Sequence, residues 1–292
     1  MRPFDYYAPR TTQEAVALLR ELGEFARPIA GGTDLVVQMK EGRTKFHYPD
    51  MVVSLAGISE MQGIEFNEGD GLRIGAGTRL ADVAASPVIR KRYPALAEGA
   101  VVVGSIQTMN MGTIGGNVCN AAPSADTAPA LLAYEAQAVI VGRDGRRSMP
   151  IEEFFRGPGE TALEPGELLA ELRLPAPPPN TSGAYRRHTP RKQMDIAVVG
   201  VATVMTIDSG TISRARIALG AVGPTPLRAR QAEAALEGAH PGGDAFARAA
   251  VAAAAECSPI SDVRGSAEFR RHLVRVMTER LARDAVRVAA GG

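Results

Sequence analysis

A glycine-rich stretch near the middle of the chain carries the residues best suited to hold a ligand. Gly112, Gly115 and Gly116 fall within five positions, and Asn117, whose amide both donates and accepts hydrogen bonds, follows at once. Because glycine has no side chain, its backbone N–H can touch a phosphate group or an aromatic ring directly. This composition predicts a loop, rather than a strand or the middle of a helix, that cradles an anionic or flavin-type ligand.

The residues after this loop predict the start of a helix. Ser124 and Asp126 are residue types that cap helix N-termini, and Pro129 suits a first helical turn. Asp126 has two interpretations, because its carboxylate can cap the helix or accept a hydrogen bond from a ribose hydroxyl. We therefore expect a glycine loop that runs toward a helix N-terminus, a favourable place for an anion.

A second glycine pair, Gly31-Gly32, lies far upstream, between Ala30 and Thr33. Alone it is modest evidence, because a tight turn explains it about as well as a ligand site. Together with the central loop, it predicts that both segments hold one extended cofactor. The nearby Gly75-Ala76-Gly77 has Leu80 where a dinucleotide fingerprint needs its third glycine, so we expect only a turn into a helix there.

The composition, and the motifs that the sequence lacks, exclude several classes of function. The chain has 292 residues, 45% of them hydrophobic, and a net charge of +1, which gives no electrostatic reason to bind nucleic acid or an anionic membrane. Two cysteines, Cys119 and Cys257, cannot build an iron–sulfur cluster, and no metal, nucleophile or acid–base motif stands out. Any redox chemistry is therefore expected of a bound cofactor. No signal-peptide pattern or membrane-spanning apolar run is found, which predicts a cytoplasmic protein.

The apolar pattern predicts two lobes followed by a separate domain. A small α/β lobe over residues 1–57 contains a capping box, strands at 27–30 and 51–55, and a helix over 33–39. A second lobe over 58–177 contains strands at 63–66, 72–75, 138–141, 147–149 and 167–174, with segment 95–103 either helical or extended. A proline-rich stretch that begins at Pro175 marks the boundary.

The last domain, residues 178–292, is expected to be a smaller α/β unit with an antiparallel sheet. Its strands are predicted near 184, at 196–207 and at 211–219, followed by helices near 228–236, 244–256 and 266–288. The last helix carries an apolar stripe that we interpret as core or subunit contact, formed by Phe269, Leu273, Val276, Met277 and Leu281.

Several motifs together resemble the FAD-binding medium subunit of the xanthine dehydrogenase and carbon monoxide dehydrogenase family of molybdenum hydroxylases. Two separated double-glycine segments, with T-I-G-G-N in the second, are the specific part of this resemblance, which runs nearly end to end. The motifs are Phe4-Asp5-Tyr6, Ala30-Gly31-Gly32-Thr33-Asp34-Leu35, Ile74-Gly75-Ala76, Gly112 to Asn117, Pro123 to Asp126, Pro165 to Leu169, Arg216 to Gly220 and Pro224-Thr225-Pro226.

The resemblance implies an α+β fold: a two-lobed PCMH-type (vanillyl-alcohol-oxidase-like) FAD-binding domain over 1–177 and the family's C-terminal domain over 178–292. It implies a pyrophosphate contact from the first loop, adenine and ribose contacts, and side chains around the flavin. The implied FAD-binding residues are Ile29, Ala30, Gly31, Gly32, Thr33, Asp34, Leu35, Val103, Gly104, Thr113, Gly116, Asn117, Asp126, Leu169, Arg187 and Ile196.

The implied function is electron transfer within a complex. A molybdopterin-binding large subunit would oxidise the substrate, a [2Fe–2S] small subunit would relay electrons, and FAD on this chain would pass them to an external acceptor. A dimer of heterotrimers is the expected assembly, with no nucleic acid, no membrane span and no metal on this chain. Two alternatives stay open: a self-sufficient FAD-dependent oxidoreductase on the same fold, and a scaffold subunit without FAD.

Overall fold

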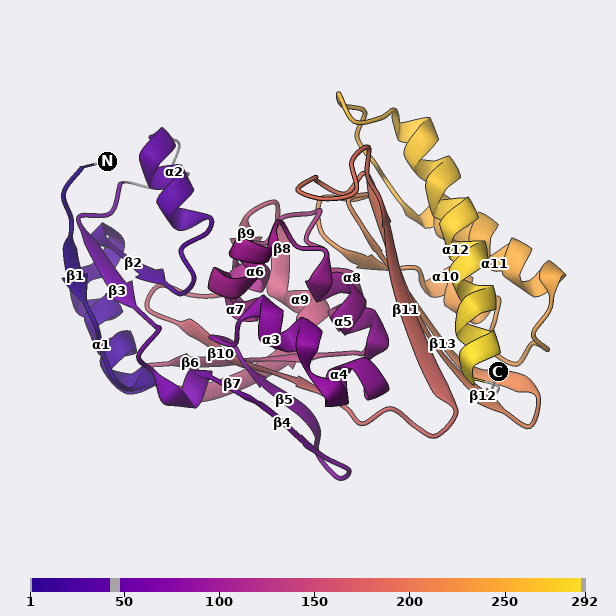
Figure 1. The fold of residues 1–292 in the computed structure, drawn as a ribbon, viewed down its shortest axis with the longest axis horizontal. Helices are drawn as coiled ribbons and strands as arrows, with labels where there is room; N and C mark the ends of the chain where they lie inside the picture. The colour runs from indigo at the N-terminus through magenta and orange to yellow at the C-terminus, as the bar shows by residue number, and fades with distance from the viewer. Residues whose placement is uncertain (1, 43–47, 290–292) are drawn as a thin grey trace.

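The first lobe is a small parallel sheet with helices against it. The structure, a computed structural model, describes residues 2–42 and 48–289. Strands pair in the order β1-β3-β2, all parallel, at one end of the molecule (Figure 1). The elements of this lobe are β1 (Asp5–Tyr7), α1 (Thr12–Leu22), η1 (Gly23–Phe25), β2 (Ala26–Ile29), α2 (Leu35–Glu41) and β3 (Met51–Ser54).

The predicted Thr11 cap of α1 is confirmed, although the Glu14 carboxylate accepts from the Arg10 N–H and not from Thr11, whereas the helix expected over 33–39 begins later. The Thr11 hydroxyl accepts a hydrogen bond from the Glu14 N–H at 3.2 Å, which fixes the start of α1. Gly32 adopts a left-handed φ of +69°, and a turn follows it, so α2 cannot begin before Leu35. The first glycine pair therefore lies in a short connection between β2 and α2.

The second lobe is a five-stranded antiparallel sheet with helices packed on one side of it (Figure 1). The strand order is β4-β5-β10-β6-β7. Its elements are η2 (Ser59–Met61), β4 (Ile64–Asn67), β5 (Gly71–Gly75), α3 (Leu80–Ala85), α4 (Pro87–Arg92), α5 (Pro94–Val101), α6 (Ile106–Met111), α7 (Ile114–Cys119), α8 (Ala128–Ala133), β6 (Gln137–Gly142), β7 (Gly145–Pro150), α9 (Ile151–Phe154), β8 (Phe155–Gly157), β9 (Glu160–Thr161) and β10 (Leu168–Leu174). The open choice for 95–103 is resolved as a helix, with Pro94 in its first turn.

The expected loop over the central glycines is wrong in one respect, because Gly115, Gly116 and Asn117 belong to helix α7. The Thr113 hydroxyl caps this helix by accepting from the Gly116 N–H at 3.0 Å. The Gly115 N–H donates to the Ala76 carbonyl at 2.8 Å, and a Cβ on Gly115 would lie 2.6 Å from that same oxygen. Close packing on Ala76 therefore overrides the low helix propensity of the glycines.

The predicted caps of the next helix are also wrong. Thr127 occupies the N-cap position of α8 and makes no side-chain cap, while Pro129 lies in the first turn as expected. Ser124 and Asp126 lie before that position. The Asp126 carboxylate is instead held by residues of the C-terminal sheet, described below.

The C-terminal unit is an antiparallel sheet, β11-β12-β13-β14, with three helices lying against it (Figure 1). Its elements are β11 (Thr181–His188), β12 (Val199–Asp208), β13 (Thr211–Gly220), β14 (Leu227–Arg228), α10 (Arg230–Ala234), α11 (Gly243–Glu256) and α12 (Ala267–Ala289). The strand expected from Ile196 begins at Val199, because the Asp195 carboxylate accepts the N–H groups of Arg191 and Ile196 and folds that segment into a loop.

The apolar stripe predicted on α12 packs against the core at Leu273, Met277 and Leu281, whereas Phe269, near the start of the helix, does not. Phe269 is 41% exposed, whereas Arg270 is buried on the same helix. The Arg270 guanidinium donates to the carbonyl of Val198 at 2.6 Å and to the Asp262 carboxylate at 2.7 Å. A buried arginine with these partners sets the orientation of the helix, and periodicity of apolar residues alone does not reveal it.

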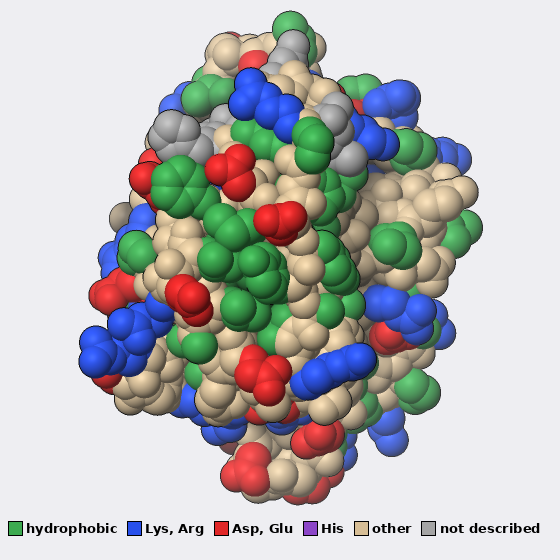
Figure 2. All heavy atoms as spheres, turned by 90° about the vertical axis from the view of Figure 1, so that its left-hand side faces the viewer, with side chains coloured by type: hydrophobic (Ala, Val, Ile, Leu, Met, Phe, Trp, Pro, Cys, Tyr) green, Lys and Arg blue, Asp and Glu red, His purple; other side chains and the backbone are tan. Residues whose placement is uncertain are grey.

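The core has two parts. One cluster joins both lobes and includes Tyr185 and Val204 of the C-terminal sheet, while the other lies between that sheet and its helices. The outer face of the first lobe mixes apolar, acidic and basic side chains without a patch of one charge (Figure 2). Within residues 2–42 and 48–289, no helix has the length and apolarity to span a membrane. Within the same residues, no group of three or more His, Cys, Asp or Glu side chains is placed to hold a metal ion.

Candidate functional site

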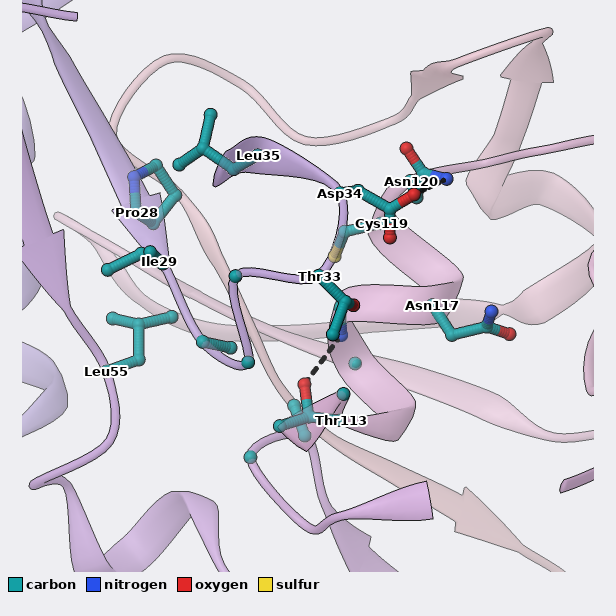
Figure 3. Close-up of a pocket in the computed structure, with 18 of the residues that line it drawn as sticks. Pro28, Ile29, Thr33, Asp34, Leu35, Leu55, Thr113, Asn117, Cys119 and Asn120 are labelled. Carbon is teal, nitrogen blue, oxygen red and sulfur yellow. Dashed lines mark hydrogen bonds between the residues drawn. The ribbon is translucent and has the colours of Figure 1, made fainter. Parts of the chain in front are cut away.

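A cavity of about 420 Å³ lies where the first lobe meets the second. The β2–α2 connection forms one wall, and the start of α7 forms another (Figure 3). Pro28, Ile29 and Leu55 give it an apolar side, and Asp34, Asn117 and Asn120 give it a polar one. The two glycine segments, distant in sequence, thus share one cavity.

Contact between the two segments explains why Gly31 must be glycine. A Cβ on Gly31 would lie 2.6 Å from the Cα of Gly112, and it would also overlap the carbonyl of Met111. Those neighbours are backbone atoms, which cannot rotate out of the way. Gly116 differs, since a Cβ there meets only the Thr113 hydroxyl, at 3.0 Å. Gly31 therefore allows the backbones of the two segments to touch. Gly116 leaves space at the cavity wall that a side chain would occupy.

The first segment offers backbone donors to a ligand. Among the described residues, no acceptor is found for the N–H groups of Gly31, Gly32, Thr33 and Asp34, while the carbonyls of Gly32 and Asp34 accept from α2. Unpaired N–H groups beside a cavity are costly unless a ligand or water accepts from them. Four such donors suit the oxygens of a diphosphate.

Side-chain hydrogen bonds hold three polar residues of the cavity wall, Asp34, Asn117 and Asn120. The Asn120 amide donates to the Asp34 carboxylate at 3.2 Å, and these side chains lie next to each other in Figure 3. Surrounding protein desolvates the Asp34 carboxyl and raises its pKa. The buried Thr127 hydroxyl donates to the Asn117 side-chain oxygen at 2.6 Å, which fixes the orientation of that amide.

Neither of two reactive groups on the cavity wall is suited to substrate chemistry. Burial raises the pKa of the Cys119 thiol to about 12, so the thiol stays protonated and is a poor nucleophile. Glu167 is tied to Arg147 by hydrogen bonds of 2.8 and 2.6 Å, and this guanidinium holds the pKa of the carboxyl below its usual range. The cavity is therefore equipped to bind rather than to react.

Twelve of the sixteen residues predicted from sequence line this cavity: Ile29, Ala30, Gly31, Gly32, Thr33, Asp34, Leu35, Val103, Thr113, Gly116, Asn117 and Leu169. Gly104, Asp126, Arg187 and Ile196 do not. Gly104 follows Val103 with a left-handed φ of +60°, and Ile196 is 47% exposed beyond the cavity.

Asp126 and Arg187 form a buried ion pair between the second lobe and the C-terminal sheet. The Arg187 guanidinium donates to the Asp126 carboxylate at 2.7 Å, and the Tyr185 hydroxyl donates to it at 2.7 Å. Desolvation raises the pKa of Asp126 to about 6, with Arg187 and Tyr185 opposing that rise. Both carboxylate oxygens are thus engaged by protein.

Sequence reasoning missed several lining residues, including Gln38, Cys119, Asn120, Leu163 and Glu167. Asn120 had a usable signal, because it lies four positions after Gly116. Had Ile114–Cys119 been predicted as a helix, that spacing would have placed Asn120 on the face of Gly116. The other missed residues face the cavity through tertiary packing alone.

Comparisons with known proteins agree with this architecture. A family model described as "FAD binding domain in molybdopterin dehydrogenase" matches residues 2–177, and one described as "CO dehydrogenase flavoprotein C-terminal domain" matches 183–285. The carbon monoxide dehydrogenase medium chain of Hydrogenophaga pseudoflava is 39% identical over 277 residues, which cover 95% of each chain. The xanthine dehydrogenase FAD-binding subunit of Escherichia coli O157:H7 is 33% identical, over 98% of this chain and 97% of the relative.

Solved structures give the same result. A chain of carbon monoxide dehydrogenase from Hydrogenophaga pseudoflava superposes with a TM-score of 0.92 at 39% identity, covering 99% of this chain and 98% of the other. A chain of quinoline 2-oxidoreductase from Pseudomonas putida 86 superposes with a TM-score of 0.91 at 30% identity, covering 99% and 98%. The predicted two-lobed fold and the predicted cofactor, FAD, are confirmed. The chain belongs to the FAD-binding subunits of the carbon monoxide dehydrogenase and xanthine dehydrogenase family of molybdenum hydroxylases.

Proposed function

We propose that this chain is an electron-transfer subunit, which takes electrons from [2Fe–2S] clusters of a partner and passes them to an external acceptor. The observation that carries the proposal is the cavity itself, where unpaired backbone donors of Gly31 to Asp34 meet an apolar wall and no reactive side chain is poised. FAD supplies the redox chemistry when bound, since it accepts and releases electrons singly or in pairs. The protein binds it, orients it and excludes water.

We propose that the diphosphate accepts from the N–H groups of the first glycine segment, with Thr113, Gly116 and Asn117 completing the contact. Val103 and Leu169 then line the apolar parts of the cofactor. The proposal extends to Gly104, Asp126, Arg187 and Ile196 where the cofactor reaches past the cavity. Asp126 directly precedes Thr127, whose hydroxyl holds the cavity-lining Asn117, and this supports the extension.

The proposed partners are a molybdopterin-binding large subunit and a [2Fe–2S] small subunit, assembled as a dimer of heterotrimers. The relatives support a complex, because one is named a medium chain and the other an FAD-binding subunit. We also propose a division into an FAD-binding domain over 1–177 and a C-terminal domain over 178–292, which the second core cluster supports because it lies entirely within the C-terminal sheet and its helices. A cytoplasmic location is proposed because Cys119 and Cys257 are both free thiols, as in reducing compartments.

Electron transfer is tested by mixing the FAD-loaded chain with the chemically reduced [2Fe–2S] partner and following flavin absorbance. The proposal predicts rapid bleaching of the flavin together with reoxidation of the clusters. Turnover of a small substrate by the isolated chain, with no bleaching by the reduced partner, would favour the self-sufficient flavoenzyme instead. Metal analysis of the co-purified complex should find molybdenum and iron outside this chain.

A further inference from the structure

Asp34 occupies a helix N-cap position without capping the helix. Four other N-cap residues, Thr11, Ser86, Ser105 and Thr113, each accept a hydrogen bond from the backbone N–H three positions later. Asp34 precedes α2 and makes no such bond, although aspartate is among the strongest capping residues. Its backbone is helical, with φ −102° and ψ −52°, whereas capping residues usually adopt an extended conformation.

The Asp34 carboxylate instead faces the cofactor cavity, where Asn120 holds it. A carboxylate can accept up to about four hydrogen bonds. Among the described residues, only the Asn120 amide donates to this carboxylate. Asp34 is exposed to solvent where it lines the cavity, and a cofactor bound there would displace water from its carboxylate. The carboxylate therefore needs a donor from whatever fills the cavity.

The chemistry of FAD restricts which part of it can lie there. Its diphosphate carries negative charge and would be repelled by a carboxylate, whereas the amide donors of Gly31 to Thr33 attract it. The cofactor's hydroxyl groups, on its ribityl chain and its ribose, are the neutral donors that a carboxylate can accept. A site built around a hydroxyl discriminates strongly against ligands that lack it.

We propose that Asp34 accepts a hydrogen bond from a hydroxyl group of FAD, on its ribityl chain or its ribose, with Asn120 as the residue that positions it. The inference rests on the proposed function and gives Asp34 a defined role in cofactor selection. It also explains the missing cap, because a carboxylate turned to the N–H groups of α2 could not reach the cavity.

The test titrates the full-length apo chain with FAD and with ADP, which keeps the diphosphate and ribose but lacks the ribityl chain. Asp34→Asn should weaken FAD binding about tenfold to a hundredfold, since hydrogen bonds to charged groups are strong ones. Its melting temperature as apo protein should be unchanged or higher, because no cap is lost and a desolvated charge is removed. Loss of ADP affinity in parallel places the hydroxyl on the ribose; unchanged ADP affinity places it on the ribityl chain.

Thr11→Ala is the matched control, because it removes a cap that is formed. It should lower the melting temperature and leave FAD affinity unchanged. The exchanged pair Asp34→Asn with Asn120→Asp keeps a side-chain hydrogen bond between the two positions but moves the carboxylate to position 120, so it should not regain FAD affinity. Asp34→Asn that binds FAD within twofold of wild type, or more tightly, overturns the inference. Failure of the wild-type chain itself to bind FAD overturns the proposed function instead.

Discussion

Glycines and backbone amides shape one wall of the cofactor cavity, whereas the junction between the second lobe and the C-terminal sheet carries ion pairs beside its apolar core. Glycines shape the cavity because they have no side chains to fill it, and the unpaired hydrogen-bond donors of the first glycine segment are backbone N–H groups. At the junction, Asp126 pairs with Arg187, and Glu135 accepts from the guanidinium groups of Arg214 and Arg216. The site for a removable ligand thus offers backbone amides beside a few charged side chains such as Asp34, whereas the permanent contact is built from ions that satisfy one another.

This difference has a physical basis. A buried charge needs its partner at all times, because losing one ion leaves the other desolvated and unpaired. Backbone N–H groups at a cavity can donate to water until the cofactor binds. The two regions should therefore respond differently to mutation: the junction through the free energy of unfolding, and the cavity mainly through cofactor affinity.

The largest loss of stability is expected from Asp126→Ala. It leaves the buried Arg187 guanidinium without its carboxylate, and breaking a buried pair costs about 3–5 kcal/mol. Denaturant unfolding at neutral pH measures this loss. Asp82→Ala is the control, since its pair with Arg79 is exposed to solvent and should contribute little to stability. Equal effects of the two substitutions would contradict the account of the junction. A fall in FAD affinity beyond the loss of stability would support a direct contact to the cofactor.

The same carboxyl predicts a pH dependence. Folding raises the pKa of Asp126 from an ordinary value of 3.8 to about 6, so the folded state binds the proton more tightly. The stabilisation that this proton binding gives to the folded state is complete below pH 3.8 and is lost as the pH rises through about 6. The difference in unfolding free energy between wild type and Asp126→Asn should change by about 3 kcal/mol across that window. A pH-independent difference would contradict the desolvation of this group.

Gly31→Ala should cost about 1–3 kcal/mol of stability and abolish measurable FAD binding. The added Cβ overlaps backbone of Met111 and Gly112, so the two glycine segments must separate. Gly243→Ala adds the same methyl group at the start of α11, where no atom lies within 4 Å, so FAD affinity should be unchanged and stability equal or slightly higher. Calorimetry and a fluorescence titration with FAD measure both properties. FAD affinity retained in Gly31→Ala would show that the cavity does not need this contact.

The smallest effect is expected from Glu135→Gln, at about 1 kcal/mol, because this carboxylate is partly exposed to solvent. Burial raises the pKa of Glu135, but Arg216 and its neighbours lower it further, so the net shift is downward. Its stabilisation is therefore present at neutral pH and lost as the pH falls through the lowered pKa. High salt should lower the unfolding free energy of the wild type by screening the ion pairs of Glu135, and the variant should lack this part of the salt dependence. Identical salt dependence of the two proteins would contradict an ionic contact.

The sequence predicts the cavity better than the junction. Glycine pairs are visible in one sequence, because steric exclusion at Gly31 and a left-handed φ at Gly32 depend on the residue's own identity. Strands such as β10 and β13 are predictable from their apolar pattern for the same local reason. Asp126 looks like a helix cap until Arg187, sixty-one positions later, is brought beside it.

Helix α7 marks the limit of local reasoning within the cavity itself. Its glycines favour a loop, and only packing against Ala76, thirty-nine positions earlier, together with the Thr113 cap, makes the helix. Asn120 was missed as a consequence. The burial of Arg270 on α12 was missed for the same reason: a polar residue with distant carbonyl partners does not register in an apolar periodicity.

The central claim is that the cavity between the first and second lobes holds the FAD. It is tested most directly by equilibrium titration of the purified full-length chain with FAD, alongside Gly31→Ala and Gly243→Ala. The account predicts one FAD per chain for wild type and for Gly243→Ala, and none for a correctly folded Gly31→Ala protein. Equal binding by all three proteins would place the cofactor elsewhere and contradict the claim.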